Sequence, residues 1–289
     1  MKHIFLINSF SLKEKTKDLK NKIEEVCKKV DLDFVIEVNS EKESTEEIIK
    51  KYKNQKVILL PVGGDGTINR VLNAMDINNN ILGYIPYGTG NDFYRANKEL
   101  LKEGINQIDL GKINDHYFIN VVCFGIDADI GNDSNFIHNE KIKKENRYKT
   151  GVFYHFLTYK PRGMKIEINN ETIEEDFTTI AVCNARYYGG GYKIAPHSSL
   201  EDGLFDVYIV KKTDRFNMMR LIAGIKYAFH ENSNKVRKIQ TNELKITSLN
   251  EIASNIDGEV LTSNSFDIKI IPKGIEVYYN QTLIDKIIK

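Results

Sequence analysis

The chain of 289 residues has 41 lysines and arginines against 40 aspartates and glutamates, so its formal charge is only +1. Its hydrophobic fraction of 41% and charged fraction of 28% are those of a folded globular protein and exclude disorder as the main state. The charge balance lacks the basic excess of a nucleic-acid-binding protein. Three widely spaced cysteines, Cys27, Cys123 and Cys183, offer neither a disulfide framework nor zinc-ligand spacing. No apolar run reaches the length of a signal peptide or a membrane-spanning helix, so we expect a cytoplasmic protein of two domains.

The first part of the chain alternates short apolar runs with helical patterns. The apolar runs predict strands at His3–Ile7, Asp33–Val38, Val57–Val62 and Ile81–Ile85. Apolar residues at helical spacing predict helices over Leu19–Val30, Thr45–Lys53 and Ile68–Met75. Strands that alternate with helices are typical of a parallel sheet covered by helices on its faces.

The pattern changes near Asp115 to a series of strand-like segments. These are Tyr117–Cys123, Lys165–Ile168, Thr178–Cys183, Phe205–Val210, Glu243–Thr247, Ser265–Ile271 and Ile275–Tyr279. Helical signals are sparse and lie chiefly at Lys141–Tyr159 and Asn217–Phe229. This half is therefore predicted to be mostly antiparallel β, a sandwich or barrel. We place the break within Gly111–Asp115, which gives a first domain of residues 1–113 and a second domain of residues 114–279.

A glycine-rich turn, Gly63–Thr67, joins a predicted buried strand to a predicted helix. Glycines let the backbone turn sharply and approach a ligand closely, and the start of a helix suits a phosphate. The alternative is a plain tight turn in which Thr67 or Asp65 caps the helix. Phosphate binding is favoured, because ligands sit at the carboxyl ends of such strands. The turn lacks both the lysine of a Walker loop and the GxGxxG spacing.

A second glycine-rich segment, Pro86–Arg95, follows the next strand. Two adjacent strands that end in such loops can form one phosphate-binding crevice. Carboxylates there repel a phosphate unless a cation intervenes, so Asp65 and Asp92 point to Mg²⁺ or to a polar network with Arg95. The alternative makes Asp92 a helix N-cap and Arg95 its surface partner.

Three further segments lie in the β-rich half. Gly189–Gly191 alone indicates a loop, and the Asp202-Gly203 pair within Pro196–Asp206 alone indicates a turn. Asp257-Gly258-Glu259 has the same ambiguity, and by itself Glu259 fits a solvated turn residue better than a base.

In their order along the chain, these five segments resemble the diacylglycerol kinase catalytic-domain family, which includes bacterial diacylglycerol and other lipid kinases and the sphingosine and ceramide kinases. The resemblance runs from about Ile4 to the C-terminus. It implies an α/β class of fold similar to NAD kinases, with an N-terminal nucleotide-binding α/β domain, a C-terminal β-sandwich and an active site in the cleft between them. Residues 280–289 would return to the first domain. The activity implied is ATP- and Mg²⁺-dependent phosphorylation of a hydroxyl of diacylglycerol or a similar lipid.

The resemblance also implies roles for individual residues. The nucleotide and its charged network would involve Asn8, Gly63, Gly64, Asp65, Gly66, Thr67, Ile68, Asn69, Arg70, Gly88, Thr89, Asn91, Asp92, Arg95 and Asp109. Asp202 would bind a structural Mg²⁺ with the backbone carbonyls of Ser199 and Leu204. Glu259 would be the general base on the lipid hydroxyl, and Asp65 would be the second catalytic residue. The chain departs from the family at Asn8–Leu12, where the usual proline and glycine are missing and only Asn8 matches.

The partners implied are a lipid at a membrane surface and a nucleotide, with no nucleic acid and no transmembrane segment; a homodimer is one option. The basic and aromatic residues of Lys141–Leu157 fit a membrane surface and a core-packed helix equally well. The segment Asn217–Phe229 is interpreted as packing and not as a lipid pocket. Two other functions stay open: an NAD kinase, which shares the GGDGT turn, and a catalytically silent binder of lipid or nucleotide.

Overall fold

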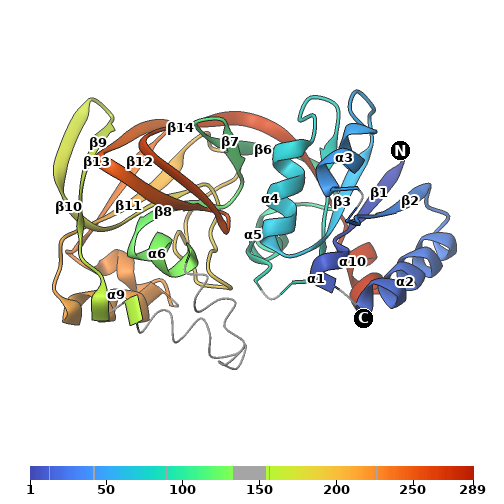
Figure 1. The fold of residues 1–289 in the computed structure, drawn as a ribbon, viewed down its shortest axis with the longest axis horizontal. Helices are drawn as coiled ribbons and strands as arrows, with labels where there is room; N and C mark the ends of the chain where they lie inside the picture. The colour runs from blue at the N-terminus through green and yellow to red at the C-terminus, as the bar shows by residue number, and fades with distance from the viewer. Residues whose placement is uncertain (13, 42, 89, 133–153, 156, 226) are drawn as a thin grey trace. The chain divides into compact units, whose positions relative to one another are not determined.

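The computed structural model describes residues 1–12, 14–41, 43–88, 90–132, 154–155, 157–225 and 227–289. The chain folds into two compact units (Figure 1). The first unit comprises Met1–Leu110, Leu200–Asp202 and Ile271–Lys289, and the second comprises Gly111–Ser199 and Gly203–Ile270. The C-terminal segment is thus part of the first unit, although most of the chain between the two belongs to the second.

A parallel sheet forms the centre of the first unit. Strand β1 (His3–Ile7) lies between β2 (Phe34–Val38) and β3 (Ile58–Gly63), and all residues of β1 and β3 are buried. Two short strands, β4 (Ile81–Leu82) and β5 (Ile85–Pro86), pair with β3 in parallel. The prediction of one strand at Ile81–Ile85 is therefore wrong, because the chain leaves regular strand geometry at the Gly83-Tyr84 step.

Helices accompany the sheet of the first unit. They are α1 (Ser9–Leu12), α2 (Lys15–Lys29), α3 (Thr45–Lys50), α4 (Asp65–Ala74), α5 (Asp92–Leu100) and α10 (Gln281–Ile288). Helix α2 buries Leu19, Ile23 and Val26, as the helical spacing predicted. Helix α10 contacts α2, so the two ends of the chain pack in one unit (Figure 1). Helix α3 is shorter than predicted and starts at a capping box between Ser44 and Glu47.

The second unit is mostly antiparallel β, as predicted. Its strands are β7 (His116–Phe118), β8 (Val121–Gly125), β9 (Arg162–Ile168), β10 (Glu171–Cys183), β11 (Phe205–Lys211), β12 (Val236–Thr241), β13 (Glu243–Ile256) and most of β14 (Glu259–Tyr279), and β6 (Gly104–Ile113) enters it from the first unit. Strands β10 and β13 each pair with β9 through one part and with β8 through another. The sheet therefore folds over on itself and encloses an apolar core, in which Phe124 meets Phe266 edge to face at 4.9 Å.

Strand β14 replaces two predicted strands, Ser265–Ile271 and Ile275–Tyr279. The strand runs through Pro272 and Gly274, which lie between the two predicted strands. The irregularity is absorbed at Lys273, whose φ is +51° and whose backbone N–H donates to Asp109 at 2.8 Å. A carboxylate thus replaces the hydrogen bond that the kinked strand gives up.

In the described ranges, the second unit contains α6 (Ile126–Asn132), α9 (Arg215–Ile225), the 3₁₀ turn η1 (Phe229–Asn232) and helical residues at 154–155 and 157–158. The single helix predicted at Asn217–Phe229 is therefore two elements. Most of the helix predicted at Lys141–Tyr159 lies outside the described residues. Among the helices of the described ranges, none is long and apolar enough to cross a bilayer.

The predicted strand Tyr117–Cys123 is interrupted by a side chain from a distant part of the chain. Strand β7 ends at Phe118 and β8 begins at Val121. The carboxylate of Asp257 accepts backbone N–H groups from Ile119 at 2.7 Å, Asn120 at 3.0 Å and Val121 at 2.9 Å. One carboxylate therefore fastens the β13–β14 turn to the start of β8.

We expect Asp257→Ala to destabilise the protein by about 3 kcal/mol, because three N–H groups lose a charged acceptor that they share. Urea unfolding of the purified protein measures this loss. Glu259→Ala is the matched control, since Glu259 is exposed in the same hairpin and should leave stability near that of the wild type. Equal stability of the two variants would refute the anchoring role of Asp257.

Candidate functional site

The two glycine-rich loops of the first unit touch each other through their backbones. Gly63 ends β3, and a Cβ atom there would lie 2.5 Å from Thr67 Oγ1. Gly88 follows β5, and a Cβ atom there would lie 2.5 Å from the Cα of Gly64. The glycines are therefore required by close approach, and the two loops form one structure, as the sequence predicted.

Asp65 joins these loops through hydrogen bonds to the start of α5. Its carboxylate accepts the backbone N–H of Asp92 at 3.0 Å and that of Phe93 at 3.1 Å. The alternative in which Asp65 or Thr67 caps its own helix is wrong, because the N-cap of α4 is Gly64 and no described side chain caps that helix. Asp65 instead provides α5 with the negative charge that the start of a helix favours.

Asp92 and Arg95 form the polar pair that the sequence suggested. Asp92 is buried, and its carboxylate lies 3.0 Å from Nη1 of Arg95, which also donates to the carbonyl of Gly90. The N-cap of α5 is Asn91, with φ of +56°, so the alternative role of Asp92 as N-cap is wrong. Asn91 holds its loop closed, because its side chain accepts from the N–H of Gly88 and donates to the carbonyl of Gly88.

The first amides of α4 differ in how they are used. The N–H groups of Thr67 and Ile68 donate to the carbonyl of Gly64 at 3.0 and 3.2 Å. An anion at this helix start would therefore meet the amides of Gly64, Asp65 and Gly66. The side chain of Ile68 is buried in the core.

The more distant members of the predicted set make other contacts. Arg70 lies 3.6 Å from Glu46 in an exposed ion pair. Asn69 is buried, and its backbone and side-chain oxygens accept from Asn73 at 3.0 and 3.1 Å. Thr89 lies outside the described residues.

Asp109 fastens three segments of the first unit. It is 1% exposed, its N–H donates to the carbonyl of Leu200 at 2.7 Å, and its carboxylate accepts the N–H of Lys273 at 2.8 Å. It therefore ties β6 to β14 and to the loop that precedes β11.

That loop contains Ser199, Asp202 and Leu204, and Asp202 is exposed. One carboxylate with backbone carbonyls is a donor set of hard oxygens, which suits Mg²⁺ completed by water. In the described ranges, no group of three or more His, Cys, Asp or Glu side chains could hold a metal. The donor set of this loop therefore suits the predicted Mg²⁺ as one carboxylate, that of Asp202, together with backbone carbonyl oxygens, and does not consist of several carboxylates.

The altered Asn8–Leu12 segment forms the short helix α1 instead of a glycine loop. Asn8 accepts the N–H of Phe10 at 3.2 Å. Asn39, which follows β2, is buried and accepts the N–H of Ser9 at 2.7 Å while it donates to Thr45 at 3.2 Å. Asn39 is therefore the centre of a polar network at this end of the sheet.

Glu259 belongs to the second unit, where it begins β14. The residues between β13 and β14, Asp257 and Gly258, have φ of +49° and +95°, as a two-residue hairpin turn requires. Ile256 and Glu259 pair across this turn, and Glu259 is exposed. The turn interpretation of the Asp-Gly pair is correct, and the anchored Asp257 fixes the backbone on which Glu259 is carried.

A small apolar cavity of about 40 Å³ lies beneath α9 in the second unit. Its apolar lining residues are Ile126, Ala181, Ile194, Val210, Met218, Leu221, Ile222, Ile225 and Val236. Polar groups also line it, among them Asp127 and His230, neither of which was predicted from the sequence. Asp127 accepts a hydrogen bond from the hydroxyl of Thr179 at 2.6 Å and from that of Tyr188 at 3.3 Å. Burial raises the pKa of the Asp127 carboxyl, and this effect outweighs the two hydrogen bonds, which lower the pKa.

His230 is 4% exposed and its Nε2 lies 2.7 Å from the carbonyl of Ile194. Its Nδ1 is buried with no hydrogen-bond partner in the described structure, and burial lowers the pKa of its ring. The histidine is therefore held neutral in a mostly apolar surrounding.

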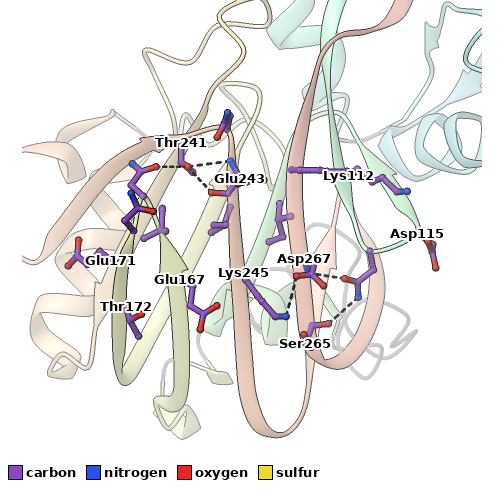
Figure 2. A pocket seen from close by; sticks show the side chains of 18 residues that line it. Lys112, Asp115, Glu167, Glu171, Thr172, Thr241, Glu243, Lys245, Ser265 and Asp267 are labelled. Carbon is purple, nitrogen blue, oxygen red and sulfur yellow. Dashed lines mark hydrogen bonds and ion pairs between the residues drawn. The ribbon is translucent and has the colours of Figure 1, made fainter.

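Figure 2 shows a second, polar hollow of the same unit, which is lined by both acidic and basic side chains. Lys245 lies 3.5 Å from Asp267 there, and Glu171 pairs with Arg237. Because charges of both signs line this hollow, and no residue of the predicted site lies there, we assign it no ligand.

Comparisons with known proteins give family matches for both parts of the chain. Residues 2–116 match the diacylglycerol kinase catalytic domain, and residues 120–279 match the YegS C-terminal NAD kinase beta sandwich-like domain. The diacylglycerol kinase of Bacillus subtilis is 29% identical over 70% of this chain and 71% of its own length. The diacylglycerol kinase of Staphylococcus haemolyticus is 27% identical over 85% of this chain and 79% of its own.

The fold is also that of known crystal structures. A diacylglycerol kinase from Bacillus anthracis superposes with a TM-score of 0.69 and 20% identity, over 98% of both chains. A second structure from that organism gives a TM-score of 0.77 and 21% identity, over 98% of this chain and 96% of the other. At this identity the likeness concerns the fold.

We expect Asp65→Ala to lower the free energy of unfolding by about 1–2 kcal/mol, because α5 loses the carboxylate at its start. Asp65→Asn keeps one acceptor oxygen and should lose less. Urea unfolding compares the two variants with the wild type. A fully stable Asp65→Ala protein would contradict the capping role.

We expect the stability of Asp127→Asn relative to the wild type to increase as the pH rises from about 4, near the ordinary aspartate pKa, to about 8. The raised pKa means that the folded state holds the proton of Asp127 more tightly than the unfolded state does. Its contribution is present below the ordinary aspartate pKa and is lost as pH rises through the raised one, whereas asparagine stays neutral. Chemical unfolding at both pH values measures this, with the exposed Asp18→Asn as control. A pH-independent difference would contradict the raised pKa.

Proposed function

Because the chain belongs to the diacylglycerol kinase catalytic-domain family and carries its YegS-type C-terminal domain, we propose that it is a lipid kinase that uses ATP and Mg²⁺. The acceptor would be a hydroxyl of diacylglycerol or of a similar lipid. The relatives from Bacillus subtilis and Staphylococcus haemolyticus, which are named diacylglycerol kinases, support this choice of acceptor.

The observation that carries the proposal is the pair of joined glycine loops at the carboxyl ends of β3 and β5. Gly64 and Gly88 lie in backbone contact, beside the start of α4. The amides of Gly64 to Gly66 and the positive end of the α4 dipole would hold the phosphates of ATP. Residues 1–113 with 280–289 would then form the nucleotide domain, and residues 114–279 the lipid domain.

Charge neutralisation in this site would come from several sources. Mg²⁺, when bound, neutralises charge on the phosphates, and phosphoryl transfer depends mainly on such neutralisation and on positioning. Arg95, which is 39% exposed beside Asp92, is a cation near the same loops. Asp65 would act from a fixed position, because the α5 amides hold its carboxylate.

Glu259 would act as the general base. The lipid hydroxyl would give its proton to the Glu259 carboxylate as its oxygen bonds to the γ-phosphorus and the bond to the ADP oxygen breaks. An exposed carboxylate on an anchored hairpin suits this task, because it is open to substrate and yet fixed in position by Asp257. Asp202, with the carbonyls of Ser199 and Leu204, would supply oxygen donors for a structural Mg²⁺.

We expect transfer of label from γ-labelled ATP to a lipid in mixed micelles of a total lipid extract. Glu259→Gln should reduce kcat at least about 100-fold, because the base is lost, with unchanged unfolding. Glu251→Gln is the matched control, since Glu251 is an exposed glutamate of the same hairpin. Asp65→Asn tests the second catalytic residue with less loss of stability than Asp65→Ala.

Each other outcome would identify an alternative. Label in NAD and in no lipid would make the protein an NAD kinase, an outcome that the match to an NAD kinase-like sandwich makes worth testing. ATP binding without transfer to any acceptor would indicate a silent binder, for which the helical Asn8–Leu12 segment is the motivating departure. Full activity of Glu259→Gln would refute the assignment of the base alone.

A further inference from the structure

Helix α9 carries apolar side chains on both of its faces. Met218 and Ile225 are buried against the second unit, whereas Phe216 is 63% exposed and Met219 is 51% exposed on the outside. Phe216 and Met219 are three residues apart and therefore share one face of the helix. Because Phe216 and Met219 are exposed, this face of α9 lacks an apolar partner in the described structure.

Two more exposed apolar side chains follow the end of α9 in the sequence. Tyr227 is 65% exposed and Phe229 is 67% exposed, and their rings lie 6.1 Å apart. The N–H of Tyr227 donates to the carbonyl of Gly224, which holds this segment against the helix. Four large apolar side chains are thus exposed within 14 positions of the chain, and exposed apolar surface of this kind is typical of an interaction site.

The charges of the helix are all of one sign. Helix α9 contains Arg215 and Arg220, both exposed, and no acidic residue. The guanidinium of Arg220 lies 5.9 Å from the ring centre of Phe216, so cation and aromatic ring are adjacent. Asp214, just before the helix, is engaged by the N–H of Asn217 at 3.0 Å. We define Arg215, Phe216, Met219, Arg220, Tyr227 and Phe229 as the α9 surface.

The α9 surface is separated from the apolar cavity by the thickness of one helix. The inner residues of α9, including Met218 and Ile222, line that cavity. The outer face of α9 thus presents apolar side chains with arginines beside them. Helices that lie in the plane of a membrane interface have the same arrangement. Arginine side chains can reach phosphate groups while their stems stay on apolar surface.

We propose that the α9 surface docks the protein on an anionic bilayer, with Phe216, Met219, Tyr227 and Phe229 inserted among the lipids and Arg215 and Arg220 on the headgroup phosphates. The inference rests on the proposed function, since a lipid kinase meets its acceptor in a membrane. A second copy of this chain fits less well, because the same surface on two copies would bring like-charged arginines together.

Sedimentation of the full chain with vesicles of phosphatidylglycerol and phosphatidylcholine tests the proposal without ATP or turnover. We expect wild-type protein to bind these vesicles and to bind pure phosphatidylcholine less. The double variant Phe216→Ser with Phe229→Ser should bind at least about tenfold more weakly, because its inserted rings are gone. Leu249→Ser with Ile105→Ser is the matched control, since these side chains are 100% and 48% exposed elsewhere.

A second pair of variants tests the charge. Arg215→Gln with Arg220→Gln should remove the preference for phosphatidylglycerol, whereas Lys17→Gln with Lys20→Gln on α2, a change of equal charge, should keep it. Unchanged melting temperatures show that the variants fold.

Two results would overturn the docking surface: vesicle binding by the Phe216 and Phe229 double variant equal to that of the wild type, or light scattering that shows a wild-type dimer which this variant converts to a monomer. Vesicle binding with no phosphorylation of any lipid would instead leave the docking surface standing and remove the proposed activity.

Discussion

The carboxylate of Asp65 is the interaction on which the proposed nucleotide site depends. It reaches from the turn after β3 to two amides at the start of α5, the helix that follows the second glycine loop. It adds to the hydrogen bond from the N–H of Tyr87 to the carbonyl of Gly63 at 2.9 Å, which lies beside the backbone contact between Gly64 and Gly88. Two loops that lie about twenty-five positions apart in the chain thereby become one rigid edge of the sheet.

Carboxylates that accept backbone N–H groups from distant parts of the chain also occur elsewhere in the molecule. Asp257 accepts three consecutive N–H groups in the second unit, and Asp109 accepts the N–H of Lys273 at the irregular point of β14. Bonds from backbone amides to a carboxylate are stronger than neutral ones, so each aspartate holds a strained or irregular stretch of chain in place. Glu259 and Asp202, in contrast, are exposed. The carboxylates of Asp65, Asp109 and Asp257 therefore hold backbone, and that of Asp92 pairs with Arg95.

The second unit consists of an antiparallel β core and, outside that core, the helix α9 with its apolar side chains. Its β core is closed by aromatic pairs such as Phe124 with Phe266. Helix α9 lies outside that core, above a cavity that contains Asp127 and His230. Sequence reasoning interpreted the segment Asn217–Phe229 as packing alone. The burial of Met218 and Ile225 agrees with this interpretation, whereas Met219 and Phe229 of the same segment are exposed.

The sequence by itself determined the alternation of β1, β2 and β3 with their helices, the change to antiparallel β, and the two glycine loops as neighbours. These features follow from local apolar periodicity and from where glycine occurs, which are properties of short segments. Only the tertiary structure decided that Tyr117–Cys123 is broken, that β14 runs through Pro272, and that Asp65 caps α5 and not α4. In each case a carboxylate supplies hydrogen bonds to amides far away in the chain, and no local pattern records such a partner. The same holds for Asn39, Asp127 and His230, whose roles depend on which distant segments bury them.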